Sequence, residues 1–278
     1  MNNIQNKTKQ FAIFGNPVSH SISPIIQNSA FEACGFDADY SKIHLEDGEK
    51  LRDTFLSQNL SGANITVPHK EVAFAQVDEV RGVAKKIGTI NTIVKENDKL
   101  IGYNTDAGGF YESIQEFEKT GTTPIKTALL IGAGGTAKAI ALILDENNIK
   151  VTIINRSKAR LEEFDKRGFS TFTYEEYEPN QDYDLIINST SAGLSDDSLM
   201  MEKEKLIKIL TKSKYAIDCI YSKERIKTPF LKVADECNIP NKDGTDMLIY
   251  QGVLACEYFM NDYDSREIIT KAMKESLK

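Results

Sequence analysis

Cysteine and histidine are scarce in this chain of 278 residues. The four cysteines stand far apart, at positions 34, 219, 237 and 256. Their spacing matches neither a metal-binding motif nor a disulfide framework. The three histidines, at positions 20, 44 and 69, form no ligand pattern either. We therefore expect a protein without a structural metal.

An excess of positive charge and long apolar runs are also missing. The net charge of -7 argues against a nucleic-acid-binding surface and against a polybasic membrane face. No apolar run approaches the roughly 18 residues that a membrane-spanning helix needs. The first ten residues, MNNIQNKTKQ, lack the apolar core of a signal peptide. We expect a cytoplasmic protein that binds neither nucleic acid nor membranes.

Hydrophobic residues make up 41% of the chain, enough for one large domain or two of moderate size. Short apolar runs alternate with helical patterns, which is typical of an α/β fold with parallel sheets. The expected strands lie at 11–15, 63–67, 91–94, 127–131, 150–157, 183–193 and 214–221. The expected helices lie at 23–35, 137–147, 158–167 and 202–211, with a further one starting near Gly108. The stretch EKTGTTP at 118–124 is a candidate crossing between domains.

A glycine-rich turn follows the strand at 127–131 and opens the next helix. It consists of Gly132, Ala133, Gly134, Gly135 and Thr136. Gly132 permits a tight turn, Gly134 lets the backbone approach a pyrophosphate, and Ala137 stands where a third glycine would allow close helix packing. The helix N-terminus adds free N–H groups for the phosphates. The turn predicts a dinucleotide site, although a purely structural turn is the alternative.

The end of the next strand indicates which dinucleotide binds. An NAD site usually has an acidic residue about 20 residues after the glycines. Here the strand ends in Asn155, Arg156, Ser157 and Lys158. Arg156 can pair with a 2′-phosphate and stack on adenine, so NADP is favoured over NAD. The alternative is that Arg156 and Lys158 are solvated loop charges.

The stretch NITVPHK (64–70) has an unusual polar face. Asn64 and Thr66 are two residues apart on a strand, so they share one face, and Pro68 ends the strand before Lys70. Taken alone, Lys70 is as well explained as a surface charge, and we interpret His69 as structural. Two other groups are similarly ambiguous. Ser21 and Ser23 suit an anion, but the alternative is that Ser23 simply caps the helix. For Asp106 the alternative is that it serves merely as an N-cap.

Taken together, these segments resemble the shikimate dehydrogenase family across nearly the whole chain. The matching motifs include GNPVSHSISPIIQN (15–28), NITVPHKE (64–71), NT (91–92), NTDAGG (104–109), GAGGTAKA (132–139), NRS (155–157), NSTSAG (188–193), DCIY (218–221), TPFL (228–231) and DGTDMLIYQG (243–252). The resemblance implies reduction of 3-dehydroshikimate to shikimate by NADPH, in the chorismate pathway to the aromatic amino acids. It implies that Lys70 acts as acid/base beside Asp106, without a metal.

The resemblance also assigns the binding residues. Those expected to hold the substrate carboxylate are Ser21, Ser23 and Tyr221. Those expected to bind ring hydroxyls are Asn64, Thr66, Asn91, Asp106 and Gln251. Those in segments expected to touch NADP are Gly132, Ala133, Gly134, Gly135, Thr136, Asn155, Arg156, Ser157, Lys158, Thr190, Ser191 and Gly244. The chain departs from the family pattern at Gln27, Thr89 and Asp246, where the family commonly has histidine, alanine and glycine.

The family fold is an N-terminal α/β substrate domain plus a Rossmann-like NADP-binding domain. The resemblance places the substrate domain at 1–106, completed by C-terminal helices at 245–278, and the NADP domain at 107–244. It allows a monomer or a homodimer. Two alternatives stay open: a quinate or dual quinate/shikimate enzyme, often linked to NAD, and a non-catalytic NADP-binding sensor. The Ser21/Ser23 pair and the lack of an acidic residue at 155 favour shikimate and NADP, and the Lys70/Asp106 pair favours an enzyme.

Overall fold

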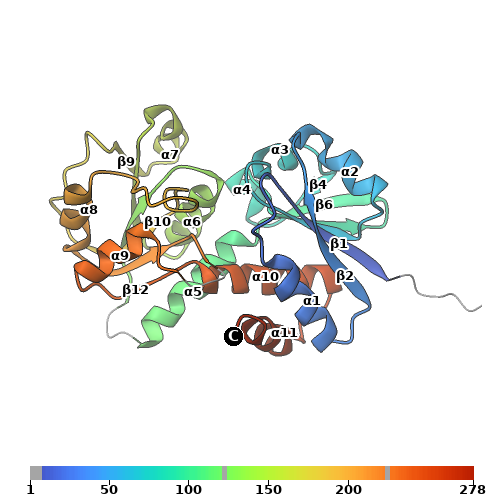
Figure 1. Ribbon diagram of the computed structural model, residues 1–278. Coiled ribbons are helices and arrows are strands. Elements are labelled where there is room, and N and C mark those ends of the chain that lie inside the picture. Colours follow the sequence, from blue (N-terminus) through green and yellow to red (C-terminus); the bar gives the residue numbers. More distant parts are fainter. Residues whose placement is uncertain (1–7, 121–123, 223–225) are drawn as a thin grey trace, which may run out of the picture. The chain divides into compact units, whose positions relative to one another are not determined.

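The computed structural model describes residues 8–120, 124–222 and 226–278, and its chain divides into two compact units (Figure 1). The N-terminal unit contains the chain up to Gly109 together with Ile249–Lys278, and the central unit contains Phe110–Leu248. The unit boundaries fall inside two helices, α5 (Asp106–Thr120) and α10 (Thr245–Met260). The crossing expected at 118–124 includes residues 121–123, which lie outside the described residues.

The sheet of the N-terminal unit has six strands. Their spatial order is β2 (Ala38–His44), β1 (Lys9–Gly15), β3 (Gly62–Ile65), β5 (Thr92–Glu96), β6 (Lys99–Tyr103) and β4 (Glu79–Val80). The sheet is mixed rather than parallel throughout, because β5 runs antiparallel to both β3 and β6. Only two residues join β5 to β6, and Asn97 there has a φ of 55°, so the strands form a hairpin. A connection that short permits only antiparallel pairing.

Short helices accompany this sheet. They are α1 (Ser23–Ala33), η1 (Gly48–Lys50), α2 (Leu51–Ser57), α3 (Lys70–Phe74), α4 (Ala84–Ile87) and α11 (Arg266–Glu275). One apolar core joins the sheet to α2, α3 and α4, and it includes Phe14 of β1, Phe55 of α2 and Ile65 of β3. The strand expected at 63–67 is β3, which ends at Ile65, two residues earlier than expected. Thr66 to Lys70 therefore follow directly after the end of a buried strand.

The central unit contains a fully parallel six-stranded sheet. Its spatial order is β12 (Asn241–Lys242), β11 (Ser213–Asp218), β10 (Tyr183–Asn188), β7 (Thr127–Ile131), β8 (Lys150–Asn155) and β9 (Ser170–Thr173). Read from β9, this is the doubly wound dinucleotide-binding order 3-2-1-4-5-6. The chain reverses its direction of travel between β7 and β10, and ligands of such sheets bind outside the strand ends at that point.

Both faces of the central sheet are covered by helices. These are α6 (Gly135–Glu146), η2 (Lys158–Arg160), α7 (Glu162–Lys166), α8 (Lys203–Leu210) and α9 (Pro229–Glu236). Alternate residues of β7 enter different cores, with Leu130 packed beside α6 and Leu129 beside α8 and α9. Period-two alternation with apolar residues on both faces explains why the sequence reads as a continuous hydrophobic run here. The predicted α/β fold is confirmed. Within the described ranges no helix is long and apolar enough to cross a bilayer.

Candidate active site

Lys70 lies at the first position of α3 and its ammonium contacts a carboxylate. Its Nζ is 2.5 Å from Oδ2 of Asp106, and the two side chains are only 13% and 8% exposed. The alternative that Lys70 is a surface charge is therefore wrong. Pro68 stands between the end of β3 and this helix, as expected for a residue that cannot continue a ladder. The backbone oxygen of Lys70 also accepts from Ile90 N, which anchors the first turn.

Asp106 begins α5 but does not cap it. The capping group is Asn104, whose Oδ1 accepts from the backbone N–H groups of Asp106 (3.1 Å) and Ala107 (3.4 Å). The alternative that Asp106 is only an N-cap is wrong, because both of its carboxylate oxygens are bonded to other side chains. Oδ2 pairs with Lys70 and Oδ1 accepts from Asn91 Nδ2 at 2.8 Å.

Asn91 connects this pair to α10. Its Nδ2 lies 2.9 Å from Thr105 Oγ1 and 3.4 Å from Gln251 Oε1, and Thr105 Oγ1 lies 3.3 Å from the same Gln251 oxygen. Gln251 reaches this position because α5 has a glycine where α10 approaches. A Cβ at Gly109 would lie 2.4 Å from Gln251 N, which is too close for any residue with a side chain to be accommodated at this position.

Asn64 lies on β3 at the other end of the same cluster. Its Nδ2 donates to Asn91 O (3.2 Å) and Thr92 Oγ1 (3.0 Å), and its Oδ1 accepts from the buried Tyr40 hydroxyl at 2.7 Å. Thr66 is half-buried just beyond the strand, and no side chain in the described ranges bonds its hydroxyl. The structure thus joins Asn64, Asn91, Asp106, Lys70 and Gln251, and sequence reasoning missed Tyr40, Thr92 and Thr105 as members of the cluster.

Ser21 and Ser23 form a separate pair at the start of α1. Both are buried, and the Ser21 hydroxyl donates to Ser23 Oγ at 3.1 Å. Ile22 occupies the N-cap position and Ser23 is the first helical residue, so the alternative that Ser23 caps the helix is wrong. Neither serine hydrogen-bonds Lys70, Asp106 or Asn91 within the described part of the chain.

His69 precedes Lys70 and is buried. Its Nε2 lies 2.6 Å from the backbone oxygen of Leu45, and its Nδ1 would be 2.7 Å from a Cβ placed on Gly48. The ring therefore fills the space against a tight backbone segment and leaves no nitrogen directed at a reacting group. These contacts support the structural role expected for His69, which stays a prediction.

The glycine turn of the central unit lies at the switch point of its sheet. Gly132 has a φ of +118°, and a Cβ there would lie 2.6 Å from Ser189 Oγ, so the turn and the segment after β10 are packed together. Gly134 is the N-cap of α6 and faces open space, and Gly135 starts the helix. Ala137 is fully buried against the sheet. The N–H groups of this helix end are therefore accessible to a phosphate.

The loop after β8 carries exposed cationic side chains, which the glycine turn lacks. The Asn155 side chain bonds the Ser157 backbone oxygen at 3.0 Å and closes the loop. Lys158 forms an exposed ion pair with Glu176 at 3.3 Å. Arg156 is exposed and makes no ion pair with any described residue. Its guanidinium is therefore available to an anionic ligand such as a 2′-phosphate.

A buried polar cluster that the sequence did not reveal supports the Thr190 segment. Asn188 Oδ1 accepts from the N–H (3.0 Å) and the hydroxyl (2.8 Å) of Thr190. Asn188 in turn donates to Asp218, which also accepts from Ile220 N and from the hydroxyl of Thr228, the N-cap of α9. Burial raises the pKa of Asp218 to about 6, against the lowering effect of these donors.

The remaining predicted residues of the central unit lie after these strands. Gly244 follows β12, donates from its N–H to Ile220 O, and approaches Cys219 so closely that a Cβ would lie 2.3 Å from its carbonyl oxygen. Ser191 is exposed, whereas Tyr221 is half-buried. Tyr221 belongs to a different unit from Ser21, and its place beside that serine stays a prediction.

Each departure from the family pattern has a defined contact. Gln27 is buried and donates to Gly252 O at 3.0 Å, next to Gln251. The hydroxyl of Thr89 accepts from Nδ2 of the α5 cap, Asn104, at 3.2 Å. Asp246 Oδ2 forms an ion pair with Nζ of Lys242, four residues earlier in the chain, at 2.9 Å. None of the three displaces a residue of the Lys70 cluster.

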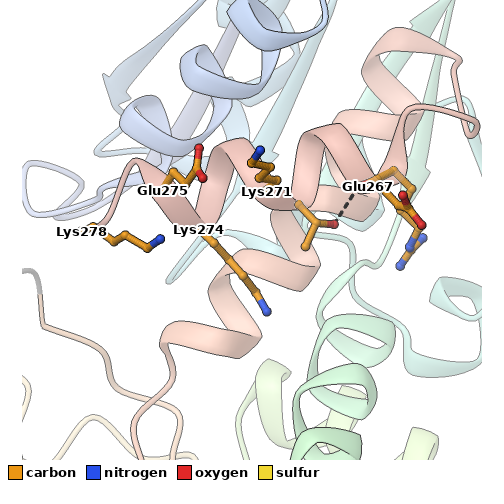
Figure 2. Close-up of a pocket in the computed structure, with 7 residues that line it drawn as sticks. Glu267, Lys271, Lys274, Glu275 and Lys278 are labelled. Carbon is orange, nitrogen blue, oxygen red and sulfur yellow. Dashed lines mark hydrogen bonds between the residues drawn. The ribbon is translucent and has the colours of Figure 1, made fainter.

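A groove of about 500 Å³ on α11 lies outside both sites (Figure 2). Its lining carries charges of both signs and comes from α11 and the last residue of the chain: Arg266, Glu267, Thr270, Lys271, Lys274, Glu275 and Lys278. Arg266 is paired with Glu257, and Lys274 donates to the Tyr250 hydroxyl. No group of three or more metal-ligating side chains occurs in the part of the chain that the structure describes.

A doubly wound sheet with a glycine turn, together with a buried lysine–carboxylate pair among amide side chains, defines an oxidoreductase linked to a nicotinamide dinucleotide. Two family models match the chain, "Shikimate dehydrogenase substrate binding domain" over residues 13–93 and "Shikimate / quinate 5-dehydrogenase" over residues 116–220. The chain belongs to the shikimate dehydrogenase family.

Individual relatives agree with this assignment. The chain is 48% identical to the shikimate dehydrogenase (NADP(+)) of Helicobacter hepaticus, over 90% of both chains. It is 43% identical to the Helicobacter pylori enzyme of the same name, over 91% of this chain and 93% of that one. Among solved structures, shikimate 5-dehydrogenase from Thermus thermophilus in complex with NADP(H) and shikimate matches with a TM-score of 0.82 and 29% identity. That match covers 96% of this chain and 99% of the other.

Proposed function

We propose that this chain is an NADP-dependent shikimate dehydrogenase that reduces 3-dehydroshikimate to shikimate. Residues 1–106, completed by 245–278, would bind the substrate, and residues 107–244 would bind NADP. The observation that carries the proposal is the buried contact between Lys70 and Asp106, with Asn91 on the second carboxylate oxygen. The names of the relatives, which include NADP(+) and shikimate, support the same reaction.

Lys70 performs the proton transfer in this mechanism. When bound, NADPH supplies the hydride that reduces the ketone carbon. One N–H of the Lys70 ammonium points to Asp106, which leaves two that can donate to the ketone oxygen. Negative charge that develops on this oxygen is stabilised by the ammonium, which then releases a proton to it. In the reverse direction Lys70 accepts the proton, and Asp106 holds its side chain in place throughout.

The other polar residues of the N-terminal unit orient the substrate. Asn64, Thr66, Asn91 and Gln251 bind ring hydroxyls, and Asp106 accepts a further one. Such a site rejects analogues that lack a hydroxyl, because an unmatched buried polar group costs about 1–3 kcal/mol. The Ser21 and Ser23 hydroxyls would hold the carboxylate at the N-terminal end of α1, and Tyr221 of the central unit stays a predicted third donor.

The residues of the central unit fit NADP. The backbone from Gly132 to Thr136 and the N-terminus of α6 would hold the pyrophosphate, because nothing lies within 4 Å of a Cβ placed on Gly134. Arg156 would pair with the 2′-phosphate, because β8 ends in Asn155 and not in an acidic residue. Asn155, Ser157 and Lys158 complete this loop, and Thr190, Ser191 and Gly244 would contact other parts of the cofactor.

Steady-state rates with four substrate and cofactor pairs test the proposal. Shikimate and quinate are each oxidised with NADP and with NAD, and the highest kcat/KM is expected for shikimate with NADP. A preference for quinate would identify the quinate-type enzyme, particularly with NAD. Binding of NADP without turnover of any substrate would identify a sensor and contradict the proposal. We also expect a cytoplasmic monomer or homodimer, which cell fractionation and light scattering would check.

A further inference from the structure

A chain of hydrogen bonds runs from a tyrosine on an edge strand to the carboxylate of the candidate site. The Tyr40 hydroxyl donates to Asn64 Oδ1 at 2.7 Å, and Asn64 Nδ2 donates to Thr92 Oγ1 at 3.0 Å. Thr92 Oγ1 donates to Asn91 Oδ1 at 3.0 Å, and Asn91 Nδ2 donates to Asp106 Oδ1 at 2.8 Å. All five residues are buried, none more than 6% exposed.

The direction of these hydrogen bonds is fixed by groups that can only donate or only accept. Asn64 Nδ2 also faces the backbone oxygen of Asn91, so the amide cannot be reversed without bringing two oxygens together. Asn91 Oδ1 also accepts from the backbone N–H of Thr105 at 2.8 Å, which excludes the reversed amide there. Thr92 therefore receives from Asn64 and donates to Asn91. Each donor in the chain points toward Asp106.

This direction determines what Asn64 can offer a ligand. Both of its amide hydrogens are used, by Asn91 O and by Thr92 Oγ1, and one lone pair of its oxygen is used by Tyr40. What is left is a single acceptor position on Oδ1. A substrate hydroxyl can donate to it, whereas a ketone oxygen would meet another oxygen lone pair. Lys70 has the opposite character, because an ammonium only donates.

Tyr40 itself is held from several sides. Its backbone N–H and carbonyl form a pair of hydrogen bonds with the side chain of Asn28, at 2.8 and 3.0 Å. Its ring packs against Phe259 of α10, with ring centroids 6.3 Å apart. Because the ring of Tyr40 is held in place, its hydroxyl has a fixed position next to Asn64. Hydrogen bonds in series also strengthen one another in a low-dielectric interior.

We propose that Tyr40 is a positioning residue that holds Asn64 as a pure acceptor, and that this arrangement selects a hydroxyl rather than a ketone at the Asn64 position of the substrate. The inference rests on the proposed function. It assigns the orientation of the substrate ring: the oxygen that alternates between ketone and alcohol faces Lys70, and a hydroxyl that does not react faces Asn64.

The test uses Tyr40→Phe, which keeps the ring and removes only the donor. Steady-state constants are measured for shikimate and for two analogues that each lack one of the non-reacting ring hydroxyls. The penalty of an analogue is defined as its KM divided by the KM for shikimate. The analogue whose penalty disappears in Asn64→Ala is the one that lacks the hydroxyl bound by Asn64. In Tyr40→Phe the KM for shikimate is expected to rise about tenfold and that penalty to shrink by about threefold or more. The other analogue's penalty and the KM for NADP stay unchanged.

A second variant and a matched control complete the experiment. Thr92→Val preserves side-chain size and frees one Asn64 hydrogen, so it is expected to reduce the same penalty. Tyr177→Phe removes another buried tyrosine hydroxyl, in the central unit, and should leave the shikimate constants unchanged. An unchanged penalty in Tyr40→Phe, or an equal rise in KM for all three substrates, overturns the inference. Lack of wild-type activity with shikimate and NADP instead contradicts the proposed function.

Discussion

The candidate substrate site and the candidate cofactor site are built from different groups. In the N-terminal unit the groups are side chains, buried and bonded to one another, as in the Lys70–Asp106–Asn91 cluster. In the central unit they are mainly the backbone of the turn at Gly132–Thr136 and the exposed cation Arg156, which makes no ion pair with a described residue. The first arrangement holds charges and dipoles in fixed positions before a ligand arrives, whereas the second presents a shape and a charge to a phosphate.

This difference determines where single substitutions should act. Removing a side chain from a buried array leaves its partners unpaired, so the chemical step or the recognition of the substrate suffers. Removing an exposed side chain beside a backbone site takes away one contact and lowers affinity for one ligand. The predictions below separate these outcomes, beginning with the largest effect.

Lys70→Met should nearly abolish turnover. Methionine has a similar length but can neither stabilise the charge that develops on the ketone oxygen nor protonate it, so kcat should fall by about 10³-fold or more. The KM for shikimate should change little, because the hydroxyl-binding side chains are retained. Initial rates over a range of shikimate concentrations provide both constants, and near-normal turnover would refute the role of Lys70.

Asp218→Asn should change how stability depends on pH. The pKa of Asp218 is raised to about 6 in the folded chain from 3.8, so the folded state holds the proton more tightly. The resulting stabilisation is present at low pH and is lost as pH rises through about 6. Urea unfolding of wild type and variant isolates this group, because the other titrations cancel in the difference. The free energy of unfolding of the wild type minus that of the variant should fall by up to about 3 kcal/mol between roughly pH 4 and 7. A difference that stays constant or rises with pH would contradict the account.

Thr89→Ala should have a small effect on stability. The hydroxyl accepts from the Asn104 side chain, which keeps a second acceptor in the Thr89 backbone oxygen at 3.2 Å. The free energy of unfolding should therefore fall by about 1 kcal/mol or less. Asn104→Ala is the matched comparison, because it removes the whole cap of α5 and should cost about 1–2 kcal/mol. Equal losses in the two variants would show that the hydroxyl carries the cap.

Sequence patterns predicted the elements whose apolar residues repeat regularly. The strands β7, β8, β10 and β11 and the glycine turn could be located, because buried parallel strands are apolar on both faces. Their ends could not, since β8, β10 and β11 end at Asn155, Asn188 and Asp218, before the expected residues 157, 193 and 221. The strand β2 was not predicted, because only Tyr40 is buried in it and the half-buried Ala38 and Ile43 stand at irregular spacing among exposed polar residues. Its apolar residues do not alternate regularly, so the periodicity on which such predictions depend gives no signal here.

Polar residues were predictable only where a motif contains them. Lys70 and Asp106 were found because they stand in two motifs, and the structure then excluded the local alternatives for both. Asp218 stands in a motif as well, but its burial depends on Thr228 and on Asn188, 30 residues away, so spacing alone carried no signal. Tyr40 had neither a motif nor a neighbouring partner, since Asn64 is 24 residues away.

A crossed measurement of Michaelis constants tests the division between the two sites most directly. Asn64→Ala and Arg156→Gln are each assayed for KM with shikimate and with NADP. We expect Asn64→Ala to raise only the KM for shikimate, and Arg156→Gln to raise only the KM for NADP, each by about tenfold or more. The NAD-dependent rate should not fall in Arg156→Gln. Exchanged effects, or equal effects of each substitution on both constants, would contradict the assignment of substrate recognition to the N-terminal unit and cofactor recognition to the central unit.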